Sequence, residues 1–232
     1  TSTNGIAIEW NYLTPHDLAG YKGASVVLSN PAVTAAVLEV ARGGLIRDGL
    51  YLGRCTAAAL LNVDREQIGT DGIDTVEQMA RHKRQVIDAA EKAVVLNAED
   101  TQCAKIAPEF PTRKLIVFSM HPGNSLFTNH LALGGIGYSF VSDGEPPFIQ
   151  RHEGQQSSKL LDIDDLPACE NGLFPQNIAN AMAAAALAEG MGVPRESIID
   201  GLRAYANSIE DAPGRFNFID GFRVKLLLDR AI

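Results

Sequence analysis

The sequence has few cysteines and no long apolar run. Its three cysteines are far apart among 232 residues and form no CxxC pair (Cys55, Cys103 and Cys169). We therefore expect neither a disulfide framework nor a structural zinc site. No stretch reaches the 18 or so apolar residues that a membrane-spanning helix needs. Both absences favour a cytoplasmic protein in a reducing compartment.

An excess of positive charge is also lacking. Lysine and arginine number 20 against 28 aspartates and glutamates, which gives a formal net charge of −8, and the sequence has no basic block. This balance argues against a nucleic-acid partner held through its phosphates, but not against a nucleotide, which needs only a local site. The chain begins at Thr1 without a signal peptide, and we expect it to be a piece of a longer protein.

The composition that is present is that of a globular α/β domain, with 46% apolar residues. Continuous apolar runs predict four buried strands, at residues 35–40, 56–63, 93–97 and 114–119. Alanine-rich or helically periodic segments predict helices, at residues 74–92, 176–191 and 195–206. Since buried strands that alternate with helices are typical of parallel sheets, we expect a mostly parallel sheet with helices on both faces.

The pattern changes in the second half of the chain. Residues 134–141 and 147–151 predict short strands of a meander or hairpin. A turn at residues 211–215 precedes an apolar strand at 221–229. We therefore divide the chain into a main domain, residues 1–210, and the start of a further domain, residues 211–232.

Polar residues at the ends of the predicted strands are candidates for a site. Glu39 stands in an otherwise apolar strand, near the edge where α/β sheets bind ligands. Its alternative role is a structural pair with Arg42 or Arg47. Asn62 follows the second strand, and neighbouring polar side chains that include Gln67 could face a cation with it. An ordinary solvated loop is the alternative.

Lys83 lies on the apolar side of its predicted helix. Positions 76, 80, 83, 87 and 90 form one stripe at helical spacing, and Lys83 is its charged member. Lysine is seldom fully buried without a partner. The side chain therefore either extends past its apolar stem to water or serves a function.

Two amides and an arginine in the last quarter of the chain are further candidates. Asn177 and Asn180 are three residues apart at the start of the alanine-rich helix and share one face. They could bind a base edge, or one of them could cap the helix. Arg215 could bind phosphate through two nitrogens, or it could be an exposed arginine of a turn.

Taken in order, six blocks of the sequence resemble motifs of the Mur ligase superfamily. They are TNGI at residues 3–6, AVLEVARGGLIRDGL at 36–50, GIDTVEQMARHK at 72–83, VLNAED at 95–100, QNIANAMAA at 176–184 and PGRFN at 213–217. The family patterns are T-T-D-G-I, E-T-A-R-G-G-I-L-R, G-I-x-T-L-E-x-L-A-x-x-K, V-L-N-A-D-D, H-N-x-x-N-A-L-A-A and P-G-R-F/L-N. The first two blocks are most similar to the cyanophycin synthetase branch.

The resemblance implies a magnesium site. Glu39 corresponds to the carboxylate that binds magnesium beside the ATP phosphates. Lys83 corresponds to a lysine that many members carry as a carbamate, which serves as a ligand of a second magnesium. Gln67 stands where relatives have a histidine ligand, so this second site departs from the family pattern, although an amide oxygen can still bind Mg²⁺. We include Asn62 among the residues expected to face the cofactor.

The resemblance also implies a nucleotide site. Asn177 and Asn180 correspond to the adenine site, Arg215 to an arginine at the γ-phosphate, and Asp229 to an aspartate that holds the ribose. The family's glycine-rich phosphate loop, which ends in Gly-Lys-Thr/Ser, is absent because no Gly-Lys pair occurs in the sequence. Asp229 is followed by Arg-Ala-Ile, where relatives have Y-A-H-N-P.

The implied activity is ATP- and Mg²⁺-dependent amide formation through an acyl phosphate. In the cyanophycin synthetase branch, arginine would be joined to an aspartate side-chain carboxylate. The alternatives are another Mur-type ligase, acting on a peptidoglycan precursor or folate, and a degenerate scaffold domain without activity. We expect the 232-residue piece alone to be inactive, and the complete protein to be a homo-oligomer.

Overall fold

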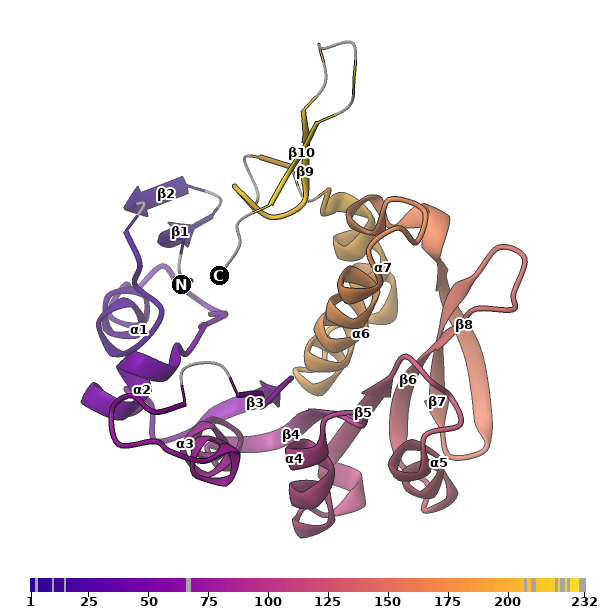
Figure 1. The fold of residues 1–232 in the computed structure, drawn as a ribbon, viewed down its shortest axis with the longest axis horizontal. Helices are drawn as coiled ribbons and strands as arrows, with labels where there is room; N and C mark the ends of the chain where they lie inside the picture. The colour runs from indigo at the N-terminus through magenta and orange to yellow at the C-terminus, as the bar shows by residue number, and fades with distance from the viewer. Residues whose placement is uncertain are drawn as a thin grey trace.

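The computed structural model describes all residues except 3, 10, 15, 66, 67, 207, 210, 211, 220, 222, 223, 225 and 230–232, and except the side chain of Tyr12. A six-stranded sheet, in the order β3-β4-β5-β6-β7-β8, crosses the molecule (Figure 1). Its strands are β3 (Cys55–Leu60), β4 (Ala90–Asn97), β5 (Leu115–Ser119), β6 (Ile136–Val141), β7 (Phe148–Glu153) and β8 (Gln156–Asp162). The pairs from β3 to β6 are parallel, and β7 and β8 are antiparallel additions. The predicted mostly parallel sheet is confirmed.

The central strands β4 and β5 are buried on both faces. Alternate residues of β4 belong to different clusters: Val94 and Leu96 pack on one face, and Ala93 and Val95 on the other. This alternation follows from the period of two in a strand, and it explains why these runs are apolar without interruption.

Helices cover both faces of the sheet, as predicted (Figure 1). One face carries α3 (Val76–Asp88), α4 (Thr101–Ile106) and α5 (Ser125–Ala132). The other carries α6 (Pro175–Gly190), which packs against β3 to β6, and α7 (Arg195–Ala204). Short 3₁₀ helices lie in the connections, at Ala107–Glu109, Thr112–Lys114, Ile163–Asp165 and Pro167–Cys169. None of the helices in the described part of the chain is long and apolar enough to cross a membrane.

Helix α3 begins with a capping box. The Thr75 side chain accepts a hydrogen bond from the Gln78 amide, and the Gln78 side chain accepts one from the Thr75 amide. This reciprocal arrangement satisfies donors at the helix start and fixes α3 after the preceding loop. The helix ends four residues before the predicted position, because β4 begins at Ala90.

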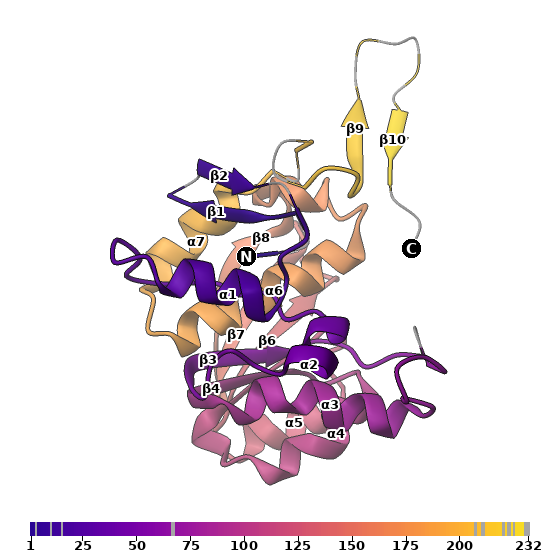
Figure 2. The same cartoon turned by 90° about the vertical axis from the view of Figure 1, so that its left-hand side faces the viewer.

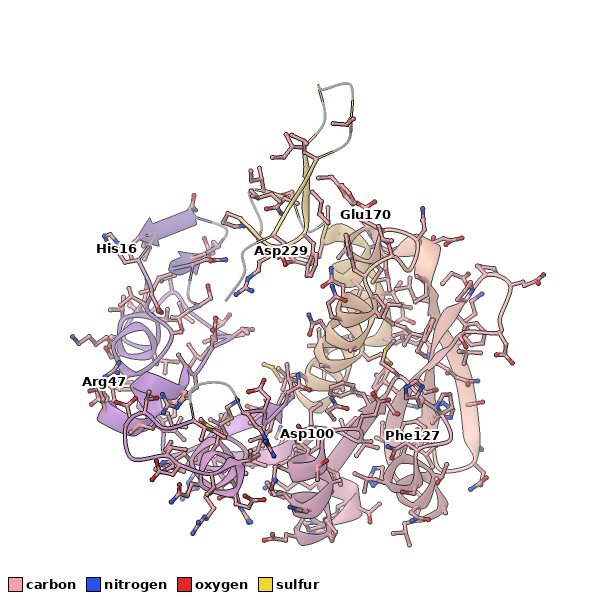
Figure 3. The ribbon with its side chains drawn as sticks, in the orientation of Figure 1. His16, Arg47, Asp100, Phe127, Glu170 and Asp229 are labelled. Atoms are coloured by element: carbon pink, nitrogen blue, oxygen red, sulfur yellow. The ribbon has the colours of Figure 1, made fainter. Side chains whose placement is uncertain are left out.

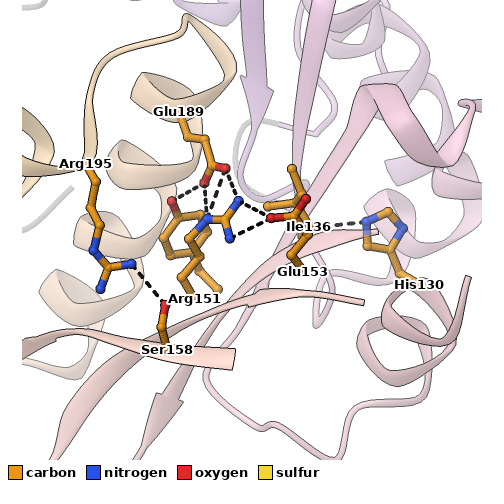
Figure 4. Close-up of polar contacts among 8 residues, drawn as sticks. His130, Ile136, Arg151, Glu153, Ser158, Glu189 and Arg195 are labelled. Carbon is orange, nitrogen blue, oxygen red and sulfur yellow. Dashed lines mark hydrogen bonds and ion pairs between the residues drawn. The ribbon is translucent and has the colours of Figure 1, made fainter. Parts of the chain in front are cut away.

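The far end of α6 is attached to the antiparallel strands by a charged network (Figure 4). Glu189 accepts hydrogen bonds from the Tyr138 hydroxyl on β6 and from the Arg151 guanidinium on β7, at 2.5–3.1 Å for the arginine. Arg151 also pairs with Glu153 at 3.1 Å. The network fixes the position of α6 over the sheet.

The first 51 residues form a layer beyond β3, with the hairpin of β1 (Ile6–Ile8) and β2 (Asn11–Thr14) and the helices α1 (Tyr21–Leu28) and α2 (Arg42–Asp48) (Figure 2). The predicted buried strand at 35–40 is wrong. That segment is not a strand, and Val37 is 75% exposed. Its contact is with the chain start, where the Glu39 amide donates to the Thr1 carbonyl at 2.9 Å. Among the described residues, no strand pairs with this segment.

The chain ends in a projecting hairpin of β9 (Asn217–Ile219) and β10 (Leu226–Leu228). Phe174, just before α6, lies against Phe216 and Phe218, with ring centroids 4.8 and 5.8 Å apart. Strand β10 is shorter than the predicted 221–229, and several residues of that range lie outside the described part. The domain boundary at residue 210 stays a prediction.

Candidate functional site

A cavity of about 760 Å³ lies between α6, α7 and the turn at residues 212–216. Asn177, Asn180 and Arg215 all line it. These three residues come from two sequence blocks, at 176–184 and 213–217, that are separated by 28 residues. Small side chains of α6, namely Ala181, Ala184, Ala185 and Ala188, line the cavity as well.

The two asparagines of α6 differ in their contacts. The Asn177 side-chain nitrogen donates to the Ala168 carbonyl at 2.6 Å, so this amide holds the 3₁₀ turn before α6. Asn180 is exposed on the cavity wall. Neither caps the helix, because the N-cap is Phe174 and no side chain makes a cap hydrogen bond. The alternative role of these asparagines as caps is therefore wrong.

The turn that carries Arg215 is organised by Asn217, a residue whose role the sequence did not reveal. Asn217 is 1% exposed, and its side-chain oxygen accepts hydrogen bonds from the Gly214 and Arg215 amides at 2.6 and 3.3 Å. Its side-chain nitrogen donates to the Ala212 carbonyl at 3.0 Å. The sequence signal for this role is the asparagine two residues after Arg215 in the PGRFN block, since asparagine often organises turns.

Phe216 completes this turn with a left-handed backbone, at φ 52°. Positive φ is uncommon for a bulky residue and needs support from its surroundings. The ring contact with Phe174 supplies such support and joins the turn to the start of α6. The contact between Phe174 and Phe216 therefore supports the turn that carries Arg215 at the edge of the cavity.

Asp229 lies next to this turn rather than on the cavity wall. Its Oδ1 atom accepts a hydrogen bond from the Phe216 amide at 3.4 Å. Figure 3 labels Asp229 at the foot of the hairpin. Asp229 therefore contacts the turn that carries Arg215.

A second group of predicted residues meets at the carboxyl end of β3. The Lys83 ammonium donates to the Asn62 backbone carbonyl at 3.0 Å. The Asn62 side-chain oxygen accepts from the Asn97 side chain at 3.0 Å, at the end of β4. Asp100, labelled in Figure 3, caps α4 and also accepts from the Val63 amide at 2.9 Å. The ends of β3 and β4 are therefore joined by polar contacts.

The carboxyl end of β5 adds a contact that sequence reasoning missed. One Glu99 oxygen accepts hydrogen bonds from the Ser119 hydroxyl at 2.8 Å and from the His121 amide at 2.9 Å. Glu99 belongs to the VLNAED block, where the family pattern has an aspartate. This block therefore connects β4 to both neighbouring strands.

The assignment of Glu39, Lys83 and Gln67 as magnesium ligands stays a prediction. No group of three or more histidine, cysteine, aspartate or glutamate side chains among the described residues could hold a metal ion. The Lys83 side chain donates to the Asn62 carbonyl, and only a carbamate on it would supply a ligand for a cation. Gln67 lies outside the described residues, and Glu39 is exposed. We therefore assign no chemical step to a magnesium ion.

Two of the three cysteines, Cys103 and Cys169, are buried. Burial raises the pKa of Cys169, which lines the cavity, to about 11. Burial and the nearby Asp100 raise the pKa of Cys103 as well. Since the thiolate is the reactive form, neither thiol is suited to nucleophilic catalysis at neutral pH.

Residues 1–188 match the Mur ligase middle domain family. The chain belongs to the Mur ligase family. Cyanophycin synthetases of Synechocystis sp. and Crocosphaera subtropica are each 35% identical to it over 233 aligned residues, which cover 100% of this chain and 26% of theirs. The cyanophycin synthetase of Geminocystis herdmanii is 33% identical with the same coverage. This Mur ligase chain therefore spans about a quarter of the length of these relatives.

Solved structures agree with the fold. A UDP-N-acetylmuramoyl-L-alanyl-D-glutamate–2,6-diaminopimelate ligase is similar with a TM-score of 0.64 and 20% identity, over 99% of this chain and 44% of that one. MurF from Acinetobacter baumannii has a TM-score of 0.53 and 20% identity, over 84% and 38%. These likenesses confirm the Mur ligase central-domain fold that the sequence blocks predicted.

Proposed function

We propose that this chain is the nucleotide-binding part of an ATP-dependent acid–amino acid ligase. The observation that carries the proposal is the convergence of Asn177, Asn180 and Arg215 on one cavity. A volume of about 760 Å³ is suited to a ligand of nucleotide size. The fit is also chemical, because the cavity combines amide groups, an arginine and a mostly apolar wall.

Each cavity residue has a distinct part in this proposal. The exposed Asn180 amide offers both a donor and an acceptor to the edge of adenine. The alanines of α6 leave room for a flat ring against the helix. Arg215 presents a planar guanidinium that suits phosphate oxygens, and Asn217 holds the backbone that carries it. Asp229, beside the same turn, is proposed to accept from the ribose hydroxyls.

The proposed reaction has two steps. A substrate carboxylate attacks the γ-phosphorus of ATP, ADP leaves, and an acyl phosphate forms. An amine then attacks the acyl carbon, gives a tetrahedral intermediate and releases phosphate as the amide forms. Arg215 would neutralise the negative charge that develops on the transferred group. The sequence resemblance implies ATP together with magnesium, and the exposed Glu39 carboxylate is the residue we propose nearest that ion.

Our proposal for the substrates is based on the similar proteins and not on the shape of the cavity. Cyanophycin synthetases match this chain along its whole length at 31–35% identity. We propose arginine as the amine and an aspartate side-chain carboxylate as the acid. The 232-residue chain by itself is proposed to be inactive, because its sequence holds no Gly-Lys pair to bind the phosphates.

The test uses the complete protein with ATP, arginine and an aspartate-containing acceptor. Steady-state ADP release should require both the acceptor and arginine, and without arginine hydroxylamine should trap the acyl phosphate as a hydroxamate. Arg215→Gln should reduce hydroxamate formation strongly, with Arg203→Gln, an exposed arginine on α7 paired with Asp165, as the control. Amide formation with another amine in preference to arginine would point to a different Mur-type ligase. Absence of any ATP-dependent product would support a scaffold.

A further inference from the structure

Arg42, the first residue of α2, is a nearly buried arginine with an organised set of partners. Its side chain is 10% exposed, and one guanidinium nitrogen pairs with Asp71 at 3.1 Å. The other donates to the Thr70 carbonyl at 2.6 Å and to the Thr70 hydroxyl at 2.9 Å. Its Nε atom is buried without a hydrogen-bond partner among the described residues. Three contacts therefore attach this side chain to a segment about thirty residues away.

Arg42 contacts a turn at residues 69–73 that is held by positive φ angles and backbone hydrogen bonds. Gly69, Asp71 and Gly72 all have positive φ, at 87°, 54° and 74°. The Gly69 amide donates to the Ile73 carbonyl at 2.7 Å, and the Ile73 amide donates to the Thr70 carbonyl at 3.1 Å. Glycine adopts left-handed conformations freely, whereas for aspartate they cost energy and need support from the surroundings. Arg42 supplies an external restraint at the strained aspartate.

The contact between Arg42 and the turn at 69–73 lies close in sequence to residues of the proposed site. Arg42 lies three residues after Glu39 in the chain. The turn at 69–73 lies between Asn62, at the end of β3, and the capped start of α3, which carries Lys83. Arg42 is thus the link between two segments that carry residues of the proposed ligase site. Sequence proximity alone suggested a Glu39–Arg42 pair, but the guanidinium contacts Asp71 and Thr70 instead.

We propose that Arg42 is a positioning residue that holds the Glu39 segment and the β3–α3 loop in a fixed position relative to each other. The proposal rests on the proposed ligase function, since it gives Arg42 an effect on turnover. Only arginine can make these contacts together, because its planar fork reaches a carboxylate and a carbonyl at fixed angles. A lysine would keep the charge opposite Asp71 and lose the second arm.

The experiment compares Arg42→Ala, Arg42→Lys and Asp71→Asn in the complete protein. Arg54→Ala is the matched control, because Arg54 is 81% exposed and pairs only at the surface with Glu91. Hydrogen exchange at Gly69 and Ile73 should accelerate in Arg42→Ala, less in Asp71→Asn, and not in Arg54→Ala. Turnover in Arg42→Ala should fall about 10- to 100-fold, the loss expected from small misplacements of reacting groups. Arg42→Lys should lie between, and millimolar guanidinium should restore part of the Arg42→Ala activity.

Two outcomes would overturn the proposal. Unchanged exchange at the turn in a folded Arg42→Ala protein would mean that Arg42 does not hold it. Faster exchange with turnover equal to that of Arg54→Ala would mean that the contact is structural only. If Arg42→Ala does not fold, Arg42→Lys and Asp71→Asn decide by the same two readouts. A parent protein without ATP-dependent turnover contradicts the proposed function itself, and the exchange measurement still decides whether Arg42 restrains the turn.

Discussion

The ammonium nitrogen of Lys83 lies 3.0 Å from the backbone carbonyl oxygen of Asn62 and donates a hydrogen bond to it. The contact joins α3 to the carboxyl end of β3, so the apolar stripe of α3 ends in a polar contact within the protein. A carbamate on Lys83 would carry oxygens that only accept hydrogen bonds. The carbamate nitrogen would keep one hydrogen, so it could still donate to the Asn62 carbonyl while the carbamate oxygens accept hydrogen bonds or bind a cation.

The first prediction separates a structural Lys83 from a functional one. Lys83→Met keeps an apolar stem of similar length and loses the hydrogen bond to Asn62. We expect its free energy of unfolding to change by no more than about 1 kcal/mol, because one hydrogen bond at a half-buried site contributes little net stability. Turnover of the complete protein should fall about 100- to 1000-fold, as when one preorganised group is removed from an active site.

Turnover and urea denaturation of parent and variant are the measurements. Lys83→Ala should be assayed in parallel with and without added bicarbonate or a short carboxylic acid, because a small acid can replace a lost carbamate. Partial recovery would support the carbamate role. Near-normal turnover of Lys83→Met would show that Lys83 only anchors α3 to β3.

The second prediction uses the different contacts of the two asparagines on α6. Asn180→Ala should raise the KM for ATP with little change in stability, since Asn180 is exposed on the cavity wall. Asn177→Ala should lower the free energy of unfolding by about 1 kcal/mol, because it leaves the Ala168 carbonyl without its 2.6 Å donor. ATP kinetics and thermal melting of the two variants give the answer. Equal KM values for Asn180→Ala and the parent would remove this face of α6 from the nucleotide site.

The fold was predictable from the sequence because its strongest signals are local. Continuous apolar runs such as residues 93–97 and the capping residues around Thr75 identify buried strands and a helix start directly. The error at residues 35–40 has a physical cause. An apolar run shows that a segment can be extended, but a strand also needs a neighbour to pair with, and the sequence does not show which segments are adjacent.

The site was predictable to a smaller extent, because its contacts are long-range. The helical stripe indicated Lys83, but its partner Asn62 is 21 residues away. Sequence proximity predicts Arg42 as a partner of Glu39, three positions away, whereas its partner Asp71 is 29 residues away. Asn217 acts through a turn whose shape depends on the hairpin behind it. Such pairings depend on how loops fold over one another, and no local pattern encodes them.

The third prediction concerns Gly201, which lines the cavity from the interior of α7. A Cβ atom at this position would meet no other atom within 4 Å. Gly201→Ala should therefore stabilise the protein by about 0.5–1 kcal/mol, because glycine is a poor helix former and the methyl group has room. ATP kinetics should stay as in the parent.

A bulky side chain at the same position should have the opposite profile. Gly201→Phe keeps the helical gain in part but extends into the cavity that Asn180 and Arg215 line. Its KM for ATP should rise, while its melting temperature stays near that of the parent. A Gly201→Phe enzyme with the parent's KM would show that ATP binds elsewhere.

The last prediction concerns the network at the far end of α6. Glu189 and Arg151 are 21% and 22% exposed, and Glu189 also accepts from the Tyr138 hydroxyl. Burial alone raises the pKa of Glu189, but the hydrogen bonds from Arg151 and Tyr138 outweigh it and hold the pKa below its usual value. Glu189→Gln preserves the shape and removes the charge. We expect a loss of about 2 kcal/mol in the free energy of unfolding at pH 7, less than for a fully buried pair.

The stability difference between the parent and Glu189→Gln should depend on pH. A carboxyl whose pKa is lower in the folded state stabilises the fold at pH values above its unfolded pKa, and this contribution disappears as the pH falls through the folded value. The stability difference between parent and Glu189→Gln should therefore be largest near neutral pH and shrink below about pH 4. Burial lowers the pKa of the buried His130 and of the half-buried His152, and both also reduce stability as the pH falls below their unfolded value. They do so equally in both proteins, so the difference isolates Glu189. Urea denaturation at several pH values between 7 and 3.5 measures it, and a difference that is constant across this range would show that the Glu189 charge adds nothing to the attachment of α6.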